Sequence, residues 1–394
     1  MTPDVSGMPV IHFRPVWFVS ALLAVLGGIA FLIQAAGPHP ERAWQAYLIN
    51  FLLWSAISQG AFLFSALMHV TRARWSGPMA GLAEAFAGFF PVSFLLFLIL
   101  AFGAKHVFPW MHADLHGKEV WLNLPFLMTR NAVGLILLYG IGLAYLFCSL
   151  KGKRDEAASG AGVSRTSRKT LFAVLYIISF ALVLSLIGFD LVMSLDPHWY
   201  STLFGAYTFI KAFYVGLAGL IILAAIVQQK ANRPVALLPA HFHDVGKLFF
   251  GFCLVWADFF YCQLVVIWYG NIPEESGYVI ARTMVTPWQP LAWAVFIISF
   301  VLPFCILLNK KIKTRPVAMS VLCSVILVGI WLEHLLLVGP ALFPHAAVLP
   351  LGVSDVLISL GFLGLMTGAV TRFLNRFPEL VLFKKAPGVH QEAH

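Results

Sequence analysis

The sequence contains few charged residues. Asp, Glu, Lys and Arg make up 11% of its 394 residues, whereas 60% are hydrophobic. Soluble domains carry about 25% charged residues, so this chain lacks the polar side chains that would cover a water-exposed fold. This excludes a soluble catalytic module of the Rossmann or TIM-barrel kind and indicates an integral membrane protein.

The sequence also lacks the ten-residue alternation of polar and apolar residues that is typical of outer-membrane barrels. It contains instead continuous apolar runs, each long enough to cross about 30 Å of hydrocarbon as a helix. We therefore predict an all-α integral membrane protein with about ten transmembrane helices. The predicted spans are 16–36, 43–70, 81–104, 123–149, 170–193, 203–228, 246–270, 287–309, 316–338 and 352–374.

Polar segments divide the chain into four parts. Residues 1–149 hold spans 1–4, residues 170–374 hold spans 5–10, and residues 375–394 form a tail. Between the two halves, the basic, Gly/Ala/Ser-rich segment 150–169 is typical of a flexible linker. Most Lys and Arg residues lie after the even-numbered spans and in the terminal segments, which predicts that both termini are cytoplasmic.

Motifs that hold redox cofactors are missing. The five cysteines form no CxxC or CxxCH pattern, which argues against haem c, an iron–sulfur cluster or a structural zinc site. A dihaem cytochrome b needs four histidines well inside helices, whereas the spans contain only His69 and His334, both near span ends. The segment from His241 to Asp244 is a weak metal motif, and we favour a helix cap there. We expect this chain to bind no metal and no redox cofactor of its own.

Ionisable residues inside the predicted spans are the main candidates for function, because each costs about 2.5–3.5 kcal/mol at the centre of a bilayer. Asp258 lies at mid-span, and Glu84 lies near the cytoplasmic end beside His69. Arg130 and Lys211 lie deeper than a polar group near the opposite face. That group consists of Asp190, Glu333, His334 and Asp355. The distribution predicts a polar path that is interrupted near the middle of the membrane.

Two interpretations of Asp258 and of Glu84 stay open at this point. Asp258 is either a proton-relay carboxylate or a buried carboxylate bonded to a neighbour, with Tyr261 and Cys262 on the same helix face as partners. Glu84 either belongs to a proton path or extends to the cytoplasmic surface.

The outer acidic residues invite a simpler interpretation. They lie close enough to the membrane surface for salt bridges, and we expect Asp190, Glu333 and Asp355 to pair with Arg130 or Lys211. In the loop after span 5, Asp196 and Pro197 are typical of a helix N-cap and first turn.

Three stretches of the sequence resemble a known family. FDLVMSLDPHWYSTLFGAYTF (189–209), HFHDVGKLFFGF (241–252) and QLVVIWYGNIPEES (263–276) are similar to the F subunit (ActF) of alternative complex III. That subunit belongs to the NrfD/polysulfide-reductase membrane-subunit superfamily. The resemblance implies two four-helix bundles, spans 2–5 and 6–9, flanked by spans 1 and 10.

The resemblance also implies a function and partners. It implies a subunit without redox centres in a quinol:electron-acceptor oxidoreductase of the bacterial cytoplasmic membrane, giving structural support and a proton-conducting path. The implied partners are an iron–sulfur protein, c-type cytochromes carrying haem c, and a second NrfD-like subunit. One alternative is an anchor that itself oxidises quinol, with Asp190, His198 and Arg282 in contact with quinone. A stand-alone proton-coupled transporter is a further alternative, which broken helices in matched positions would favour.

Overall fold

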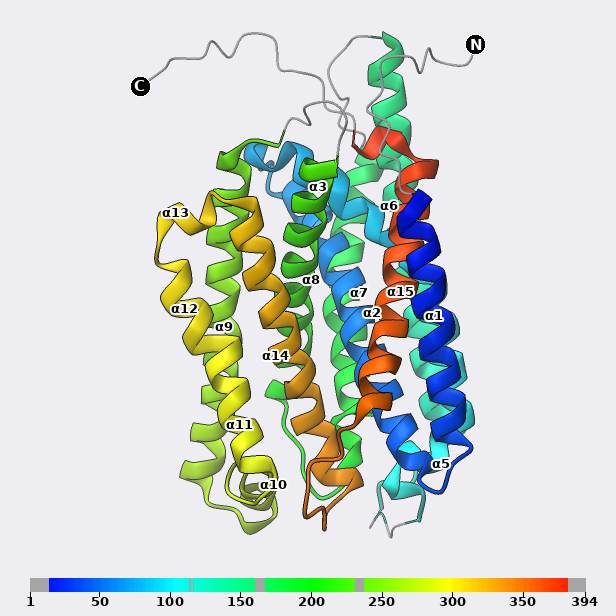
Figure 1. The fold of residues 1–394 in the computed structure, drawn as a ribbon, viewed down its shortest axis with the longest axis vertical. Coiled ribbons are helices and arrows are strands. Elements are labelled where there is room, and N and C mark those ends of the chain that lie inside the picture. Colours follow the sequence, from blue (N-terminus) through cyan, green and yellow to red (C-terminus); the bar gives the residue numbers. More distant parts are fainter. Residues whose placement is uncertain (1–13, 113–114, 116, 160–166, 231–236, 382–394) are drawn as a thin grey trace.

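Helices form every regular element in the described part of the chain, which comprises residues 14–112, 115, 117–159, 167–230 and 237–381 of a computed structural model. Ten of the helical segments are long and apolar enough to cross a membrane (Figure 1). The prediction of an all-α multi-pass membrane protein is therefore confirmed.

The first bundle is built around helix α2. The third membrane-spanning segment of the chain, Arg74–Val107, belongs to this bundle and is irregular. Its helix is interrupted by 3₁₀ turns at Ala85–Phe89 (η2) and Ala101–Gly103 (η3). Helix α2 packs against α3, α4, α5 and α7, and the side chains of Gln59 and Ser65 reach α6 through hydrogen bonds. The helices are α2 (Pro40–Val70), α3 (Gly77–Glu84), α4 (Phe90–Leu100), α5 (Ala104–Val107), α6 (Leu124–Ser159) and α7 (Ser167–Leu191).

The second bundle is built around α8 and α14. A π-helical turn at Ile297–Val301 (η6) joins α11 (Trp288–Phe296) to α12 (Leu302–Leu307). Short helices α10 and α13 close the two ends of this bundle (Figure 1). The helices are α8 (Leu203–Lys230), α9 (Pro239–Gly270), α10 (Pro273–Thr283), α11 (Trp288–Phe296), α12 (Leu302–Leu307), α13 (Lys310–Lys313) and α14 (Pro316–Leu342).

The two bundles meet where α2 crosses α8. A Cβ atom on Gly60 would lie 1.9 Å from the carbonyl oxygen of Ala212, and one on Gly216 would lie 2.2 Å from the backbone of Gly60 and Ala61. Small residues let transmembrane helices approach this closely and pack through van der Waals contact. The crossing places α2, α8 and α14 in the centre of the protein. Their apolar stretches are more buried than those of the other seven membrane-spanning segments.

Helices α1 (Arg14–Ala35) and α15 (Val353–Arg376) lie side by side along the first bundle (Figure 1). Their contact also depends on glycine, since a Cβ on Gly27 would lie 2.4 Å from the Cα of Gly361. At the opposite edge of the protein lie α9, α11 and α12 (Figure 1). The start of α1, the end of α15 and the basic helix α13 share one end, which we call the basic end.

Two local predictions were wrong. Residues 150–159 continue helix α6 and do not form a flexible linker, because Lys, Arg, Glu and Ala are good helix formers. Residues 160–166 of that predicted linker lie outside the described residues. Asp196 and Pro197 do not start a helix, since α8 begins at Leu203 and Asp196 follows a 3₁₀ turn. Helix α9 starts at Pro239, so the segment from His241 to Asp244 belongs to its first turns.

Candidate functional site

Glu84 is the centre of a buried cluster near the basic end. Ser65 and Ser149 donate hydrogen bonds of 2.9 and 2.7 Å to its Oε1, and Lys153 donates one of 3.0 Å to its Oε2. Lys169 in turn donates to the Ser149 hydroxyl. Glu84 is 2% exposed, while the side chain of Lys153 is 25% exposed. The carboxylate is therefore held inside the protein and connected through Lys153 to the surface.

A second group of polar side chains lies deeper between α2, α4 and α6. Gln59 Nε2 donates to the Tyr139 hydroxyl at 3.0 Å, and Tyr139 donates to Ser93 Oγ at 2.8 Å. Ser93 and Ser55 share a hydrogen bond of 2.6 Å. All four side chains are buried. They form a continuous chain of groups that both donate and accept hydrogen bonds.

An aromatic layer separates these two groups. Gln59 and Ser65 are six residues apart on α2, which corresponds to about 9 Å along the helix. Phe62 fills the interval, with ring centroids 5.2 Å from Phe90 and 5.8 Å from Tyr145. Phe90 stacks on Tyr139 at 4.8 Å. The polar interior is thus interrupted by apolar rings.

The third group lies beyond Gln59 and comes from α8 and α14. Lys211 Nζ lies 3.1 Å from Glu333 Oε1, and the Tyr207 hydroxyl donates to the same oxygen. His334 Nδ1 lies 2.8 Å from the carbonyl oxygen of Ile330. These side chains are nearly fully buried, and the predicted pairing of Glu333 with Lys211 is present.

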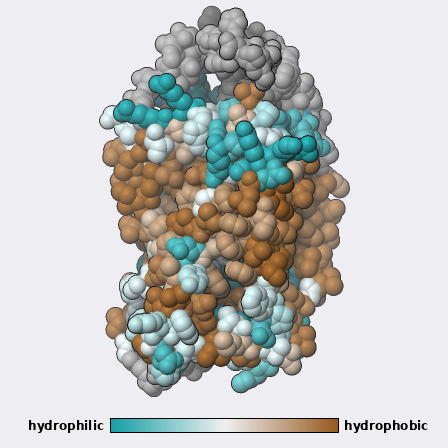
Figure 2. Space-filling view, turned by 90° about the vertical axis from the view of Figure 1, so that its left-hand side faces the viewer, coloured by the Kyte–Doolittle hydropathy of each residue, from teal (hydrophilic) through white to brown (hydrophobic). Residues whose placement is uncertain are grey.

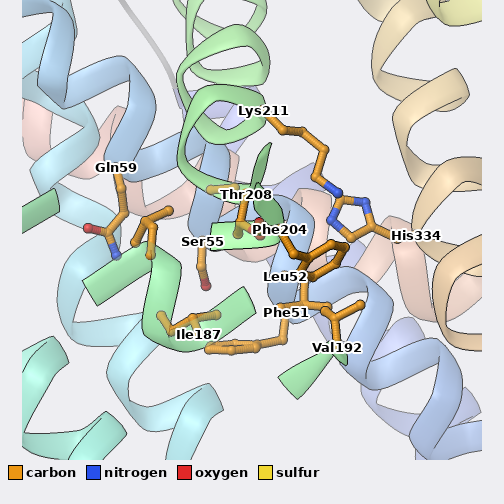
Figure 3. A pocket seen from close by; sticks show the side chains of 12 residues that line it. Phe51, Leu52, Ser55, Gln59, Ile187, Val192, Phe204, Thr208, Lys211 and His334 are labelled. Carbon is orange, nitrogen blue, oxygen red and sulfur yellow. The ribbon is translucent and has the colours of Figure 1, made fainter. Parts of the chain in front are cut away.

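A small cavity connects the second and third groups. It has a volume of about 30 Å³, and its polar lining includes Ser55, Gln59, Thr208, Lys211 and His334 (Figure 3). A cavity needs about 10–15 Å³ on this measure to hold one water, so this one has room for water between the two groups. Gln59 Oε1, which is buried, finds no hydrogen-bond partner in the described part of the protein.

We call these three groups and the cavity the buried polar column. Its residues are ionisable or hydroxyl-bearing, apart from the amide of Gln59. Such groups can pass protons along hydrogen bonds when water completes the chain. The members of the column are Glu84, Ser65, Tyr145, Ser149, Lys153, Lys169, Gln59, Tyr139, Ser93, Ser55, Lys211, Glu333, Tyr207 and His334.

Asp190 and Arg130 form a separate buried pair at the end opposite to the basic end. Arg130 donates two hydrogen bonds, of 2.6 and 2.7 Å, to the two oxygens of Asp190. Asn131 and Trp121 donate to the same carboxylate, and the Arg130 guanidinium lies 4.0 Å from the Trp121 ring. The predicted pairing is present, and its bidentate geometry is typical of a structural ion pair.

Asp355 and His69 have partners that the sequence did not indicate. Asp355 pairs with Arg42 at 3.2 Å, and not with Arg130 or Lys211 as expected. Its Oδ2 also accepts from the backbone of Gly352 and so caps α15. His69 Nε2 lies 3.1 Å from the Thr170 hydroxyl, and its ring lies 6.1 Å from Tyr145, at the border of the column.

Arg282 lies in α10, outside the membrane-spanning segments. Its guanidinium lies 3.4 Å from the Tyr278 ring and donates to the carbonyl oxygens of Tyr278 and Leu337. Tyr278 stacks on Trp199 at 3.7 Å. Burial lowers the pKa of Arg282 and raises the pKa of Tyr278. His198, next to Trp199, is exposed.

The three residues proposed for quinone contact therefore do different things in the structure. Asp190 is taken up by its ion pair, and Arg282 binds backbone carbonyls. Neither the cavity of the column nor the open hollow beside Trp110 is lined by Asp190, His198 or Arg282.

Asp258 lies outside the column. It is exposed on the outward face of α9, and no side chain of another helix among the described residues forms a hydrogen bond or ion pair with it. Cys262 Sγ, one turn along the same helix, is 3.9 Å from its Oδ1, while Tyr261 is 63% exposed. The described residues include no basic group within ion-pair distance of Asp258. The structure does not bring Asp258 together with Glu84 or with the outer polar group.

The histidines at the start of α9 act on the helix end. His241 Nδ1 accepts a hydrogen bond of 2.9 Å from the backbone of Leu238, as expected of a cap. Lys247 pairs with Asp244 at 2.8 Å. In the described part of the chain, no three His, Cys, Asp or Glu side chains gather as metal ligands.

Sequence reasoning missed the uncharged centre of the column. The side chains at this centre carry no charge, so a search for charged residues inside the spans did not identify them. They are Ser55, Gln59, Tyr139 and Ser93. A signal was present on α2, because Ser55, Ser58, Gln59 and Ser65 lie on nearly one face in the central part of this helix. The charged residues predicted a polar path that is interrupted near the middle of the membrane, and they did not indicate the aromatic residues that separate Ser65 from Gln59.

A comparison with known protein families found no family model that matches this chain, and a comparison with curated proteins found no match either.

Proposed function

We propose that this chain is a membrane subunit of a bacterial quinol:electron-acceptor oxidoreductase of the alternative complex III kind, and that its buried polar column conducts protons. The proposal that protons are conducted rests on the geometry of the column. It reaches from the partly exposed Lys153 near the basic end to the Lys211–Glu333 pair on the far side of the aromatic layer. Buried ionisable groups in membrane helices are costly, and they commonly mark ion or proton paths.

The first half of the proposal rests on the resemblance of the three sequence stretches and on the two-bundle architecture. In this proposal electrons pass through haem c and iron–sulfur clusters in partner subunits, and both termini are cytoplasmic. The basic end then faces the cytoplasm, so that Glu84 takes up protons there and the Lys211–Glu333 pair passes them toward the other side.

The aromatic layer gives the proposed path a closed state. Phe62 and Phe90 leave no hydrogen-bonding group between Ser65 and Gln59 on α2. A proton crosses this interval only when water or a moving side chain bridges it. We expect turnover of the complex to control that bridging.

Purification of the tagged protein from native membranes in mild detergent tests the respiratory assignment. Mass spectrometry should identify an iron–sulfur protein, c-type cytochromes and a second NrfD-like subunit, and a reduced-minus-oxidised spectrum should show haem c. A haem-free protein that migrates alone, in a detergent that keeps other respiratory complexes intact, would contradict the assignment and favour the transporter.

A further inference from the structure

Two helices at the edges of the protein are almost unburied. In the most apolar stretches of α1 and α9, only 11% and 17% of the residues are buried, the lowest shares among the ten membrane-spanning segments. Because both helices turn most of their surface away from the protein, lipid or another protein must cover them in the membrane. The outward faces of the two helices differ in composition, and this difference indicates whether lipid or another protein covers α9.

Helix α1 has the composition of a lipid-facing helix. From Val16 to Ala35 it contains no charged residue, and its large exposed side chains are apolar. Ser20, which is polar, turns inward and shares a hydrogen bond of 2.9 Å with Thr367 of α15. The helix thus keeps the Ser20 hydroxyl away from the hydrocarbon.

Helix α9 places its charged residue outward. Asp258 is the one charged side chain between Lys247 and the helix end at Gly270. It lies about 16 Å along the helix from Lys247 and about 15 Å from Trp268, and so at the middle of the hydrocarbon. Figure 2 looks onto this edge of the protein and shows a hydrophilic spot within the hydrophobic band. A carboxylate at this depth needs a hydrogen-bond donor, and Cys262 at 3.9 Å is a weak one.

The residues around Asp258 follow the spacing of a helix–helix contact. Alternating steps of four and three residues along the outward face give a continuous stripe, and steps of this kind characterise the seam between two packed helices. Gly251 lies in the stripe with open space where a Cβ would be, so a second helix can approach closely there. We call this stripe the α9 seam, and it consists of Lys247, Gly251, Leu254, Asp258, Tyr261, Val265 and Trp268.

We infer that the α9 seam binds a transmembrane helix of a different polypeptide, which carries a basic hydrogen-bond donor, Lys or Arg, at the depth of Asp258. Charge complementarity selects this occupant, because an ionised carboxylate in hydrocarbon is satisfied by an opposite charge. A second copy of this chain fits poorly. A symmetric dimer through the same surface would bring two Asp258 carboxylates together.

Photo-crosslinking of the full chain in native membranes tests this inference. A benzophenone amino acid replaces Leu254 or Tyr261 on the α9 seam, and in matched controls it replaces Leu22 or Ile29 on the exposed face of α1. Both pairs are seven residues apart, and all four side chains are exposed, so the probes leave the interior undisturbed. Mass spectrometry then maps the attachment points on any crosslinked protein.

We expect both seam probes to attach to one transmembrane helix of another protein, with a Lys or Arg between the two attachment points. The α1 probes should attach to lipid. Asp258→Leu should lower the crosslink yield from Tyr261 about five-fold, whereas Cys262→Ser should leave it unchanged. A purified Asp258→Leu protein that elutes as one sharp peak excludes misfolding as the cause.

Three results would overturn the inference. They are seam probes that attach only to lipid, attachment to a second copy of this chain, and attachment to a helix without a basic residue at that depth. The inference does not require the partner to be a respiratory subunit, so a seam crosslink to a protein that belongs to no quinol-oxidising complex would contradict the proposed function alone.

Discussion

Glu333 and Asp258 are both carboxylates in membrane-spanning helices, and their surroundings are opposite. Glu333 is fully buried and binds Lys211 and Tyr207 from another helix of the same chain. Asp258 is exposed and has one weak contact on its own helix. The difference is that Glu333 has its partners within the chain, whereas no described residue of another helix pairs with Asp258. The following predictions test that comparison, starting with the largest expected effect.

Glu333→Leu should destabilise the isolated protein most. It leaves Lys211 buried without its counter-ion, and breaking a buried pair in this way costs about 3–5 kcal/mol. The free energy of unfolding, measured by denaturant titration in detergent, should fall by this amount. The double variant Lys211→Met/Glu333→Leu should recover most of the loss, because no charge is left unpaired. Glu379→Gln breaks a partly exposed pair with Arg154 and should cost at most about 1 kcal/mol. A Glu333→Leu protein as stable as the wild type would refute the assignment of a buried ion pair.

Gly60→Ala should have the next largest effect. The added methyl group would meet the Ala212 carbonyl oxygen in the tight crossing of α2 and α8. Overpacking of this kind costs about 1–3 kcal/mol. Gly251→Ala on the α9 seam is the matched control, since its methyl group meets nothing in the chain. Equal unfolding free energies for the two variants would contradict the contrast between the interior crossing and the α9 seam.

Tyr278→Phe should have a smaller effect on the free energy of unfolding, and this effect should depend on pH. Burial raises its pKa in the folded protein, so its contribution to stability is complete below the unfolded pKa of about 10 and is lost as pH rises beyond that value. At pH 11 Tyr278→Phe should be more stable than the wild type by about 1 kcal/mol. Near pH 8 this pH-dependent difference should be absent, because Tyr278 is protonated in both the folded and the unfolded protein. Tyr261→Phe, at an exposed position, is the control, and it should show no such change with pH.

Asp258→Leu should have the smallest effect on the isolated chain. No group of another helix among the described residues depends on this carboxylate, so the free energy of unfolding in detergent should change by at most about 0.5 kcal/mol. Chain stability and partner binding would then respond in different ways to the same substitution. A loss as large as that of Glu333→Leu would show that Asp258 has an essential partner within the chain.

Much of the fold could be predicted from the sequence. Apolar runs of the right length revealed all ten spans, because the requirement to cross hydrocarbon acts on each helix separately. Helix ends were harder, as residues 150–159 show. Their charged and alanine-rich composition is compatible with a solvated linker and also with a helix that extends beyond the membrane.

The sidedness of Asp258 could not be predicted in the same way. The inward face of α9 carries Phe249, Cys253 and Trp256, and the outward face carries Leu254 and Tyr261 beside the aspartate. Both faces are otherwise apolar, so hydropathy does not distinguish the side that faces the protein from the side that faces away. The ion pairs of Glu333 and Asp190 were predictable, because few basic residues lie at their depth.

The central claim, that the buried polar column carries protons in a quinol-oxidising complex, is tested most directly by counting protons. The complex, reconstituted into vesicles with its own quinol and electron acceptor, yields a ratio of protons moved per electron. Glu84→Gln removes the carboxylate near the basic end, while Lys153, whose side chain is partly exposed, can still reach the surface. We expect electron transfer to continue and the proton-to-electron ratio to fall, with Glu379→Gln matching the wild type. An unchanged ratio in Glu84→Gln would contradict the account.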